Sequence, residues 1–414
     1  MKTRTLALVI LLCLVAAACQ SAPPAPSASP PSGDILIASD LPTSGEAASL
    51  TMPLQQAIQL AIDQHPTIGQ YRLAYWSLDD ELAGTPNQAK GRENVKRMIG
   101  TPRVLGMIGP YTSNVAFAEI PEANSAQLVM LSPTNTDPCL TQPAPCDQQP
   151  ITLRPSGLNN YFRTAAPDTV QGRAMAKYVT RTLNVQRVAA FNEWGPNGGL
   201  ILDSFAKELA LTGGELVLRR ELVAGTSDFG DFLAAASTNG AQAIYALGQA
   251  DQGICAARAQ MTSKLFPGGA YFLATDGVTG VDKCIKDAAD NATAMYATLP
   301  DVDATLSTDA AAAKVVADYR KAFPKTPPTA GYMFSAYDCA LILIEAITRA
   351  VQANGGAIPT RQQVVDEVAH GVFKDGATGT YSFDSNGDAI SPLMSMYAVQ
   401  NNQWVYLERI DASS

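Results

Sequence analysis

The chain has 414 residues, of which 47% are hydrophobic and 16% are charged, and its formal net charge is −9. A chain of this length exceeds what one hydrophobic core usually holds, so we expect one large globular unit with two lobes. The net negative charge, without clusters of basic residues, argues against nucleic acid or an anionic lipid surface as a partner.

The N-terminal region predicts export and lipid anchoring. In residues 1–18, Lys2 and Arg4 precede an apolar run, and small residues lead to Cys19, an arrangement that resembles the bacterial lipobox. We expect cleavage before Cys19 and lipidation of its thiol, with an ordinary secretory signal as the alternative. Residues 19–33 are rich in Pro, Ser and Ala and are expected to form a flexible tether. These features place the protein at the outer face of a bacterial membrane, in the periplasm or at the cell surface.

The remaining cysteines suit an exported protein. Cys139 and Cys146 bracket a short Pro-rich loop, and Cys255 and Cys284 flank a later strand and loop. We predict that both pairs form disulfides. Cys339 lies in an apolar segment and is predicted to be a buried free thiol. A metal site is the alternative for these cysteines, but the two histidines lie far from them in sequence, so we expect no metal and no cofactor.

Strands and helices alternate along the chain. The first run has predicted strands at 35–38, 71–77, 104–108 and 128–131, with helices at 53–63 and 88–99 and a third after residue 113. The second run has predicted strands at 188–191, 216–221, 243–247 and 271–274, with helices at 171–183, 199–211, 228–237 and 253–262. Repeated units of this kind predict mostly parallel sheets with helices on both faces, in two doubly wound, Rossmann-like lobes. The C-terminal segment alternates and contains Asn386-Gly387, which predicts a terminal hairpin turning there.

Two polar turns after neighbouring strands form a candidate half of a small-molecule site. Thr112 and Ser113 stand where a helix N-cap is expected, and a helix N-terminus has unpaired N–H groups that suit a carboxylate. The second turn, residues 132–136, adds three hydroxyl groups and an amide. In open α/β sheets, ligands bind beyond the carboxyl ends of the strands, where both turns lie. The alternative is that Ser113 and Thr136 merely cap helices.

A series of short motifs runs in a fixed order through residues 34–410. They are Leu41-Pro42-Thr43-Ser44-Gly45, Asp79-Asp80, Gly109-Pro110-Tyr111-Thr112-Ser113, Leu131-Ser132-Pro133, Phe162-Arg163-Thr164 with Asp168 and Gln171-Gly172, Ser227-Asp228-Phe229, Thr275-Asp276-Gly277, and Phe383-Asp384 with Asn386-Gly387. None is specific alone. Together they resemble the type I periplasmic solute-binding proteins, specifically the branched-chain amino-acid (Leu/Ile/Val-binding-like) receptors of ABC importers.

The resemblance implies the periplasmic-binding-protein-like I fold, an α/β fold whose two lobes are joined by three crossover segments and close over a ligand. Lobe 1 is expected to comprise residues 34–162 and 301–378, and lobe 2 residues 163–300 and 379–410. It also implies a monomer that works with an ABC permease.

Family roles can be carried onto matching residues. Ser113 is expected to hold the α-carboxylate of the ligand through its hydroxyl and backbone. A backbone carbonyl and a threonine hydroxyl of the second turn, here Thr134 and Thr136, are expected to share in holding carboxylate and ammonium. Asp276 is expected to pair with the α-ammonium, or alternatively to be a turn residue before Gly277. A zwitterion needs N–H donors at one end and a carboxylate at the other.

The part of the site that would hold the ligand side chain departs from the family. Leu50 is the nearest equivalent of an aromatic residue that the branched-chain receptors place over the ligand. Trp194 and Gln249 stand near positions that often carry tyrosine. Trp194 and Tyr111 are expected to supply aromatic walls, or alternatively to pack in the scaffold. Specificity for leucine is therefore not expected to follow; a more polar amino acid, an amide, urea or another small carboxylate stays open.

Catalytic motifs do not support an enzyme. Ser204 and Lys207 match the serine–x–x–lysine of penicillin-recognising enzymes, but they fall in the middle of a predicted helix and the accompanying motifs are missing. The stronger rival is a lipoprotein of the same fold that regulates cell-envelope enzymes by protein contact, without a ligand. We predict a lipid-anchored solute-binding subunit that delivers a small amino-acid-like ligand to an ABC permease.

Overall fold

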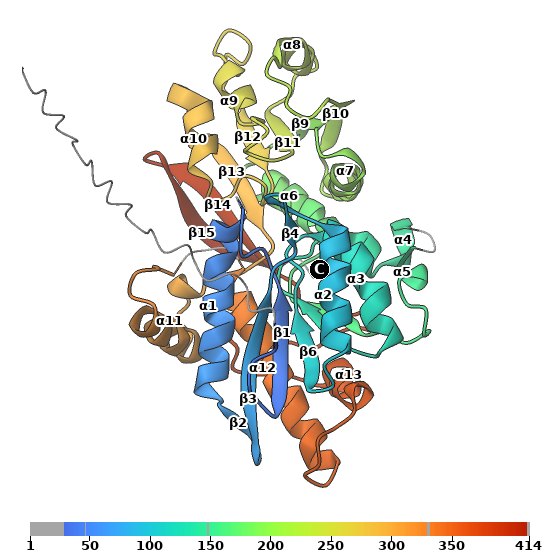
Figure 1. Cartoon of the computed structure of the whole chain (residues 1–414). Helices are drawn as coiled ribbons and strands as arrows, with labels where there is room; N and C mark the ends of the chain where they lie inside the picture. Colours follow the sequence, from blue (N-terminus) through green and yellow to red (C-terminus); the bar gives the residue numbers. More distant parts are fainter. Residues whose placement is uncertain (1–28, 46, 147–148, 329–331, 412–414) are drawn as a thin grey trace, which may run out of the picture.

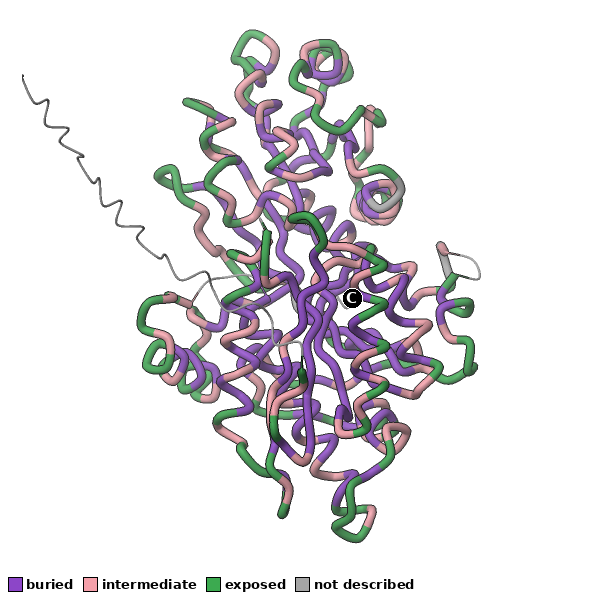
Figure 2. The backbone as a smooth tube through the Cα atoms, viewed as in Figure 1, coloured by how far each residue is buried: buried purple, intermediate pink, exposed green. Residues whose placement is uncertain are grey.

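The computed structural model describes residues 29–45, 47–146, 149–328 and 332–411, and shows two α/β lobes, each built around one sheet (Figure 1). The predicted signal peptide and the predicted lipidation site at Cys19 lie outside the described residues. Within the described residues, no helix combines the length and the apolar character that crossing a bilayer requires. Buried backbone runs through the sheets of both lobes, with exposed residues on the outer helices and loops (Figure 2).

Lobe 1 has a six-stranded sheet in the order β2-β3-β1-β6-β7-β8. Its strands are β1 (Ile35–Asp40), β2 (Thr67–Ile68), β3 (Tyr71–Leu78), β6 (Val104–Ile108), β7 (Val129–Ser132) and β8 (Tyr161–Arg163). Its helices are α1 (Ala48–Gln64), α2 (Gln88–Ile99), α3 (Ser113–Ser125), α11 (Ala310–Ala322), α12 (Met333–Ala353) and α13 (Arg361–His370). All pairings except that of β2 with β3 are parallel, as the alternation of strands and helices predicts.

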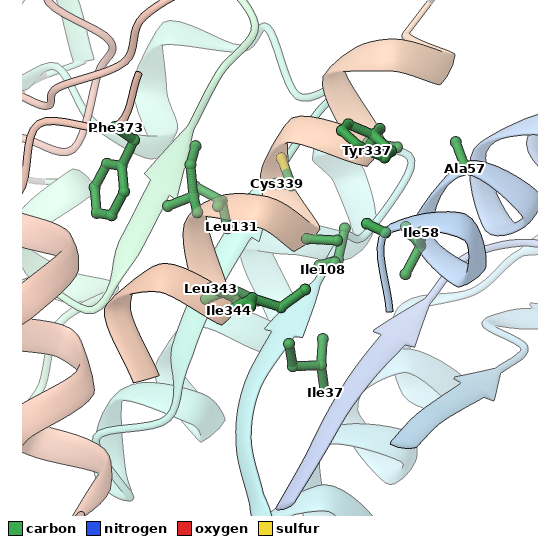
Figure 3. Packing of buried hydrophobic residues seen from close by; sticks show 14 of the residues in the cluster. Ile37, Ala57, Ile58, Ile108, Leu131, Tyr337, Cys339, Leu343, Ile344 and Phe373 are labelled. Carbon is green, nitrogen blue, oxygen red and sulfur yellow. The ribbon is translucent and has the colours of Figure 1, made fainter. Parts of the chain in front are cut away.

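The central strand β1 is buried along its whole length because helices cover both faces of the sheet. Ile35 and Ile37 point into one core cluster, while Leu36 and Ala38 point into another, as the two-residue period of a strand requires. The first cluster includes the apolar face of α12, which packs beside α1 (Figure 3). Cys339 lies inside this cluster as a buried free thiol.

Lobe 2 has a seven-stranded sheet in the order β10-β9-β11-β12-β13-β14-β15. Its strands are β9 (Arg187–Asn192), β10 (Glu215–Glu221), β11 (Ala243–Leu247), β12 (Tyr271–Ala274), β13 (Met295–Leu299), β14 (Leu393–Gln400) and β15 (Gln403–Asp411). Its helices are α6 (Asp168–Arg181), α7 (Gly195–Leu211), α8 (Gly230–Thr238), α9 (Ala256–Gln260) and α10 (Asp282–Ala288). The remaining short elements of both lobes are β4 (Glu81–Leu82), β5 (Thr85–Pro86), η1 (Pro138–Leu140), α4 (Pro143–Cys146), α5 (Gln149–Thr152), η2 (Ala289–Asn291) and η3 (Ala304–Leu306).

The chain passes between the lobes three times: after β8, after β13, and between α13 and β14. A buried ion pair joins the first and third passages, with Arg163 Nε 2.7 Å from Asp388 Oδ1. Disulfides join Cys139 to Cys146 in lobe 1 and Cys255 to Cys284 in lobe 2, with Cα–Cα distances of 5.1 Å in each.

The terminal hairpin turns at a different place from the one predicted. β14 and β15 are antiparallel and meet at Asn401 and Asn402, whose φ angles are 50° and 57°. Asparagine tolerates these left-handed conformations, which a tight hairpin turn requires. The predicted turn at Asn386-Gly387 instead forms a short loop, in which the Asp384 carboxylate accepts the N–H of Asn386 at 2.9 Å. The motif was a genuine turn, but it precedes the hairpin.

Residues 31–34 enter lobe 1 at the amino ends of its strands. The Arg103 guanidinium, just before β6, donates hydrogen bonds to the carbonyl groups of Pro31 and Gly33. The N–H of Asp34 donates to the carbonyl of Arg72, near the start of β3, at 2.9 Å. Residues 31–34 therefore join lobe 1 at the end that is opposite to the carboxyl ends of its strands.

Candidate functional site

A cavity of about 410 Å³ is lined by residues of both lobes. It lies beyond the carboxyl ends of β6, β7 and β12. A second compartment of about 320 Å³ shares part of this lining. The eight residues predicted from sequence to contact a ligand all line the first compartment: Leu50, Tyr111, Ser113, Thr134, Thr136, Trp194, Gln249 and Asp276. Their ligand contacts stay a prediction, but their convergence is a property of the fold.

The start of α3 forms one wall. Gly109 follows β6 with φ of 119°, and a Cβ there would lie 2.4 Å from the carbonyl oxygen of Asp40, so the chain can turn closely over the sheet only with glycine. Thr112 is the N-cap residue by position, yet its side chain makes no capping hydrogen bond. The Ser113 hydroxyl also does not cap; it accepts the N–H of Asp137 at 3.3 Å. The simple capping interpretation of Ser113 is therefore wrong, and the N-terminus of α3 keeps its positive partial charge for an anion.

The turn after β7 forms the adjoining wall. The Ser132 hydroxyl organises it, because it accepts the N–H groups of Thr134 and Asn135 at 3.3 and 3.1 Å. The Thr134 hydroxyl donates to the carbonyl of Tyr111 at 2.7 Å and so ties the two turns together. The carbonyl of Thr136 accepts the N–H of Asp168 at 2.8 Å. Thr134 and Thr136 are held in place by these bonds and line the cavity.

Asp276 lies in the lobe 2 wall, two residues after β12. Its carboxylate accepts hydrogen bonds from Gln171 Nε2 at 3.0 Å and from the Tyr332 hydroxyl at 3.2 Å. Burial raises the pKa of Asp276, and the hydrogen bonds from Gln171 and Tyr332 oppose that rise. A half-buried carboxylate whose charge is only partly compensated favours a ligand that carries positive charge.

Sequence reasoning missed Tyr332. This residue precedes α12 with φ of 61°, a left-handed conformation that is unusual for tyrosine. Its N–H donates to Asp301 Oδ2 at 2.5 Å, and the Ser335 hydroxyl donates to the other oxygen of the same carboxylate. These bonds hold the Tyr332 ring in the cavity wall. No local motif marks this position, and only the three-dimensional path of the chain brings it beside Asp276.

Asp168 belongs to one of the family-like motifs in the sequence, and the structure places it in the cavity wall. It is the first residue of α6 and is 1% exposed. Burial raises the pKa of Asp168 well above its usual value, and the charges of Asp276 and Asp137 raise it further. A hydrogen bond with Thr136 and the charge of Arg163 lower it in part.

Apolar and aromatic side chains form the rest of the lining. Tyr111 is half-buried, and burial together with the charge of Asp276 raises its pKa to about 12, so it stays a neutral hydrogen-bonding group. Trp194 packs partly against the lobe 2 core and also lines the cavity, and its contact with a ligand stays a prediction. Leu50 is 59% exposed at the start of α1. The second compartment extends past Pro53, Leu54, Val281 and Leu299.

The serine–x–x–lysine match of Ser204 and Lys207 lies away from this cavity. Ser204 and Lys207 are on α7 and line a separate hollow, and the Ser204 hydroxyl donates to the carbonyl of Ile201 at 2.9 Å. Among the described residues, no group of three or more His, Cys, Asp or Glu side chains is arranged to hold a metal ion.

A protein-family model described as periplasmic binding protein matches residues 35–403. The chain belongs to the periplasmic binding protein family. It is 26% identical over 369 residues to the Leu/Ile/Val-binding protein BraC3 of Rhizobium johnstonii, with 88% of this chain and 91% of that protein aligned. The two-lobed fold is that of this family.

Solved structures of the same fold include proteins with different ligands. The leucine-binding protein LivK of Thermotoga maritima superposes with a TM-score of 0.72 at 24% identity, covering 91% of this chain and 99% of that one. A solute-binding protein of an ABC transporter from R. palustris, solved with benzoate, gives a TM-score of 0.68 at 18% identity, covering 91% and 96%. At these identities the likeness concerns the fold.

Proposed function

We propose that this family member is the extracytoplasmic, lipid-anchored solute-binding subunit of an ABC importer, and that it traps a small amino-acid-like ligand between its lobes. One observation carries the proposal: a single cavity between the lobes has an uncapped helix N-terminus on one side and the half-buried Asp276 carboxylate on the other. A zwitterion of modest size matches both ends, and about 410 Å³ is within the usual range for small-molecule sites.

The roles follow from this polarity. The N–H groups at the start of α3 and the Ser113 hydroxyl bind the carboxylate of the ligand. The carbonyl of Thr134 and the hydroxyl of Thr136 orient its polar groups, and Asp276 pairs with its ammonium. Gln249 and the aromatic lining contact the remainder of the ligand, which can extend toward the apolar second compartment. Because Leu50 and Gln249 replace the residues expected in branched-chain receptors, we infer a side chain different from leucine.

Closure of the lobes is the whole mechanism, without bond chemistry. The lining comes from both sheets, so a ligand in the cavity favours the state in which the lobes are together. A monomer anchored through Cys19 would then present the closed form to permease subunits. The partner and the anchor are inferred from family membership and from the sequence; the metal-free, cofactor-free and non-enzymatic character is part of the same proposal.

A thermal-shift screen tests the proposal. The protein is unfolded and refolded to remove carried-over ligand, and is then heated with each of the twenty amino acids, amides, urea, polyamines and short carboxylates. A ligand at about 1,000 times its dissociation constant stabilises by about 4 kcal/mol, a shift of several degrees. A response to α-amino acids supports the proposal. A response confined to amides or carboxylates retains transport and removes the ammonium role of Asp276, and silence across the panel favours the ligand-independent regulator.

A further inference from the structure

The cavity carries more negative than positive charge. Among the described residues that line its two compartments, the only acidic or basic side chains are those of Asp168 and Asp276. The nearby cations Arg173 and Lys207 line a separate hollow. The N-terminus of α3 supplies partial positive charge for one carboxylate of a ligand. A ligand that fits this lining must therefore bring positive charge of its own.

Asp168 has an unused hydrogen-bonding atom. Its backbone N–H donates to the carbonyl of Thr136 at 2.8 Å, and its carboxylate is hydrogen-bonded with the Thr136 side chain. The Oδ1 atom, however, is fully buried and has no hydrogen-bond partner. Buried polar atoms in native structures nearly always have a partner, and an orphan carboxylate oxygen beside a cavity points to a donor that the cavity would hold.

The surroundings of Asp168 disfavour its ionised form when the cavity is empty. Burial is the main cause, and the charges of Asp276, from the turn after β12, and Asp137, from the turn after β7, add to it. Arg163 and the Thr136 hydrogen bond act in the opposite direction. The phenol groups of Tyr245 and Tyr332, on elements packed nearby, are themselves kept neutral because burial raises the pKa of each. An arriving cation would reverse the balance.

We propose that Asp168 and Asp276 hold the cationic nitrogen of the ligand between them, and that its arrival displaces a proton from Asp168. The balance is simple: a carboxylic acid and an ammonium ion become a carboxylate–ammonium pair, and one proton goes to solvent. This inference rests on the proposed function and narrows it. The ligand must carry both a carboxylate and a cationic nitrogen, so simple carboxylic acids and neutral amides bind poorly.

The test combines matched probes with matched variants. The probe is the L-amino acid that gives the largest thermal shift, compared with the carboxylic acid of the same skeleton without the amino group. Both are titrated calorimetrically into the parent, Asp168→Asn, Asp276→Asn and Asp251→Asn proteins, between about pH 5 and pH 8 and in buffers of different ionisation enthalpy. Asp168→Asn preserves size, and Asp251→Asn removes an exposed charge of lobe 2 outside the cavity lining.

The parent and Asp251→Asn proteins should release protons on binding the amino acid, with affinity that rises with pH by up to about tenfold per unit. Asp168→Asn should lose this proton release and bind the amino acid about tenfold or more weakly, while its weak affinity for the deaminated acid stays at the parent value.

Proton release that persists in Asp168→Asn, or affinity of the parent that does not change with pH, would overturn the inference while amino-acid binding still supports the proposed function. Loss of both probes in Asp168→Asn would also overturn it, because the residue would then be structural. If no amino acid binds the refolded parent, this inference fails, and the response to the rest of the thermal-shift panel decides whether the transport role is retained.

Discussion

The hydroxyl of Tyr332 lies 3.2 Å from Asp276 Oδ2, and this hydrogen bond joins the start of α12, a lobe 1 helix, to the strand-end turn of lobe 2. The donor is fixed by the Asp301 carboxylate, which holds both the N–H of Tyr332 and the hydroxyl of Ser335. The acidic group proposed to bind the ligand is therefore oriented by the opposite lobe. In the proposed mechanism, closure of the lobes would therefore also orient this carboxylate.

Replacing Tyr332 with phenylalanine should weaken ligand binding mainly at acid pH. The hydrogen bond lowers the pKa of Asp276 against the effect of burial, so its loss lets the pKa rise and leaves less ionised carboxylate in acid. We expect binding of a zwitterion to weaken by about tenfold near pH 5.5 and by less near pH 8, as measured by calorimetry. Tyr337→Phe is the control, because that hydroxyl bonds Gln64 outside the cavity lining. An equal loss at both pH values would contradict the explanation.

A buried acid cluster should make lobe 1 less stable as the solution becomes alkaline. Burial raises the pKa of Asp40 to about 7 and that of Asp80 to about 8, and it raises the pKa of Glu119, which is hydrogen-bonded to Asp40, well above its usual value. Because each folded-state pKa exceeds the unfolded value, the stability is present in acid and is lost as pH rises through about 7 to 8.

Glu119→Gln should reduce that loss. Glutamine keeps the size of the side chain and removes one ionisable group. The decline in the free energy of unfolding with pH should therefore shrink, by on the order of 1 kcal/mol for each unit by which the folded-state pKa of Glu119 exceeds its unfolded-state pKa. Denaturant unfolding at a series of pH values measures it. Glu122→Gln, on the same helix but paired with Lys96 at the surface, should follow the parent. If Glu119→Gln also follows the parent, the cluster does not control the pH dependence.

Gly109→Ala should destabilise the protein through a backbone clash as well as through strain. The added Cβ would lie 2.4 Å from the carbonyl oxygen of Asp40, and φ is 119°. At Gly157 φ is also positive, at 78°, but no atom lies within 4 Å, so Gly157→Ala reports the strain alone. We expect roughly 1 kcal/mol for Gly157→Ala and at least about 2 kcal/mol more for Gly109→Ala in denaturant titrations. Equal effects would show that the turn can move away from β1.

Asp388→Asn should cost about 3–5 kcal/mol, because it leaves the Arg163 guanidinium buried without its anion. Burial alone would raise the pKa of Asp388, but the charge of Arg163 and their hydrogen bond hold it below the usual value. The stability that the ion pair contributes is therefore lost as pH falls through this lowered pKa.

The same guanidinium donates to the carbonyl of Asp137 at 2.7 Å, and the N–H of Asp137 donates to the Ser113 hydroxyl in the cavity wall. Asp388→Asn should therefore weaken ligand binding too. Asp203→Asn, in an exposed pair with Arg219, should change the melting temperature little. Similar melting temperatures for the two variants would contradict the assignment.

The positions of the strands, together with the rule that ligands bind beyond the carboxyl ends of parallel strands, account for most of the correct predictions from sequence. The predicted strands at 104–108, 243–247 and 271–274 agree with the structure in both bounds, because each is a buried apolar run between clear turn signals. Parallel sheets bring such strand ends together, and that is why Ser113, Thr136 and Asp276 line one cavity.

The errors came from contacts that no local pattern encodes. Tyr332 reaches the cavity from the start of α12 in lobe 1, more than fifty residues after Asp276, in a conformation that its residue type disfavours. Asp168 resembled an ordinary helix-start residue, and only its burial beside the cavity distinguishes it. The sequence predicts the hairpin turn at Asn386-Gly387 because that dipeptide is the stronger local signal, whereas strand pairing selects Asn401-Asn402.

The hydrogen bonds from Arg103 to the carbonyl groups of Pro31 and Gly33 fix where the chain leaves lobe 1. That exit is at the amino ends of the strands, and the cavity is at their carboxyl ends. A membrane attachment through the preceding chain would therefore connect to lobe 1 at the end away from the cavity. Lobe 2 could then move relative to lobe 1 without moving the attachment point. The free energy of lobe closure would therefore not depend on how tightly the protein is held at the membrane.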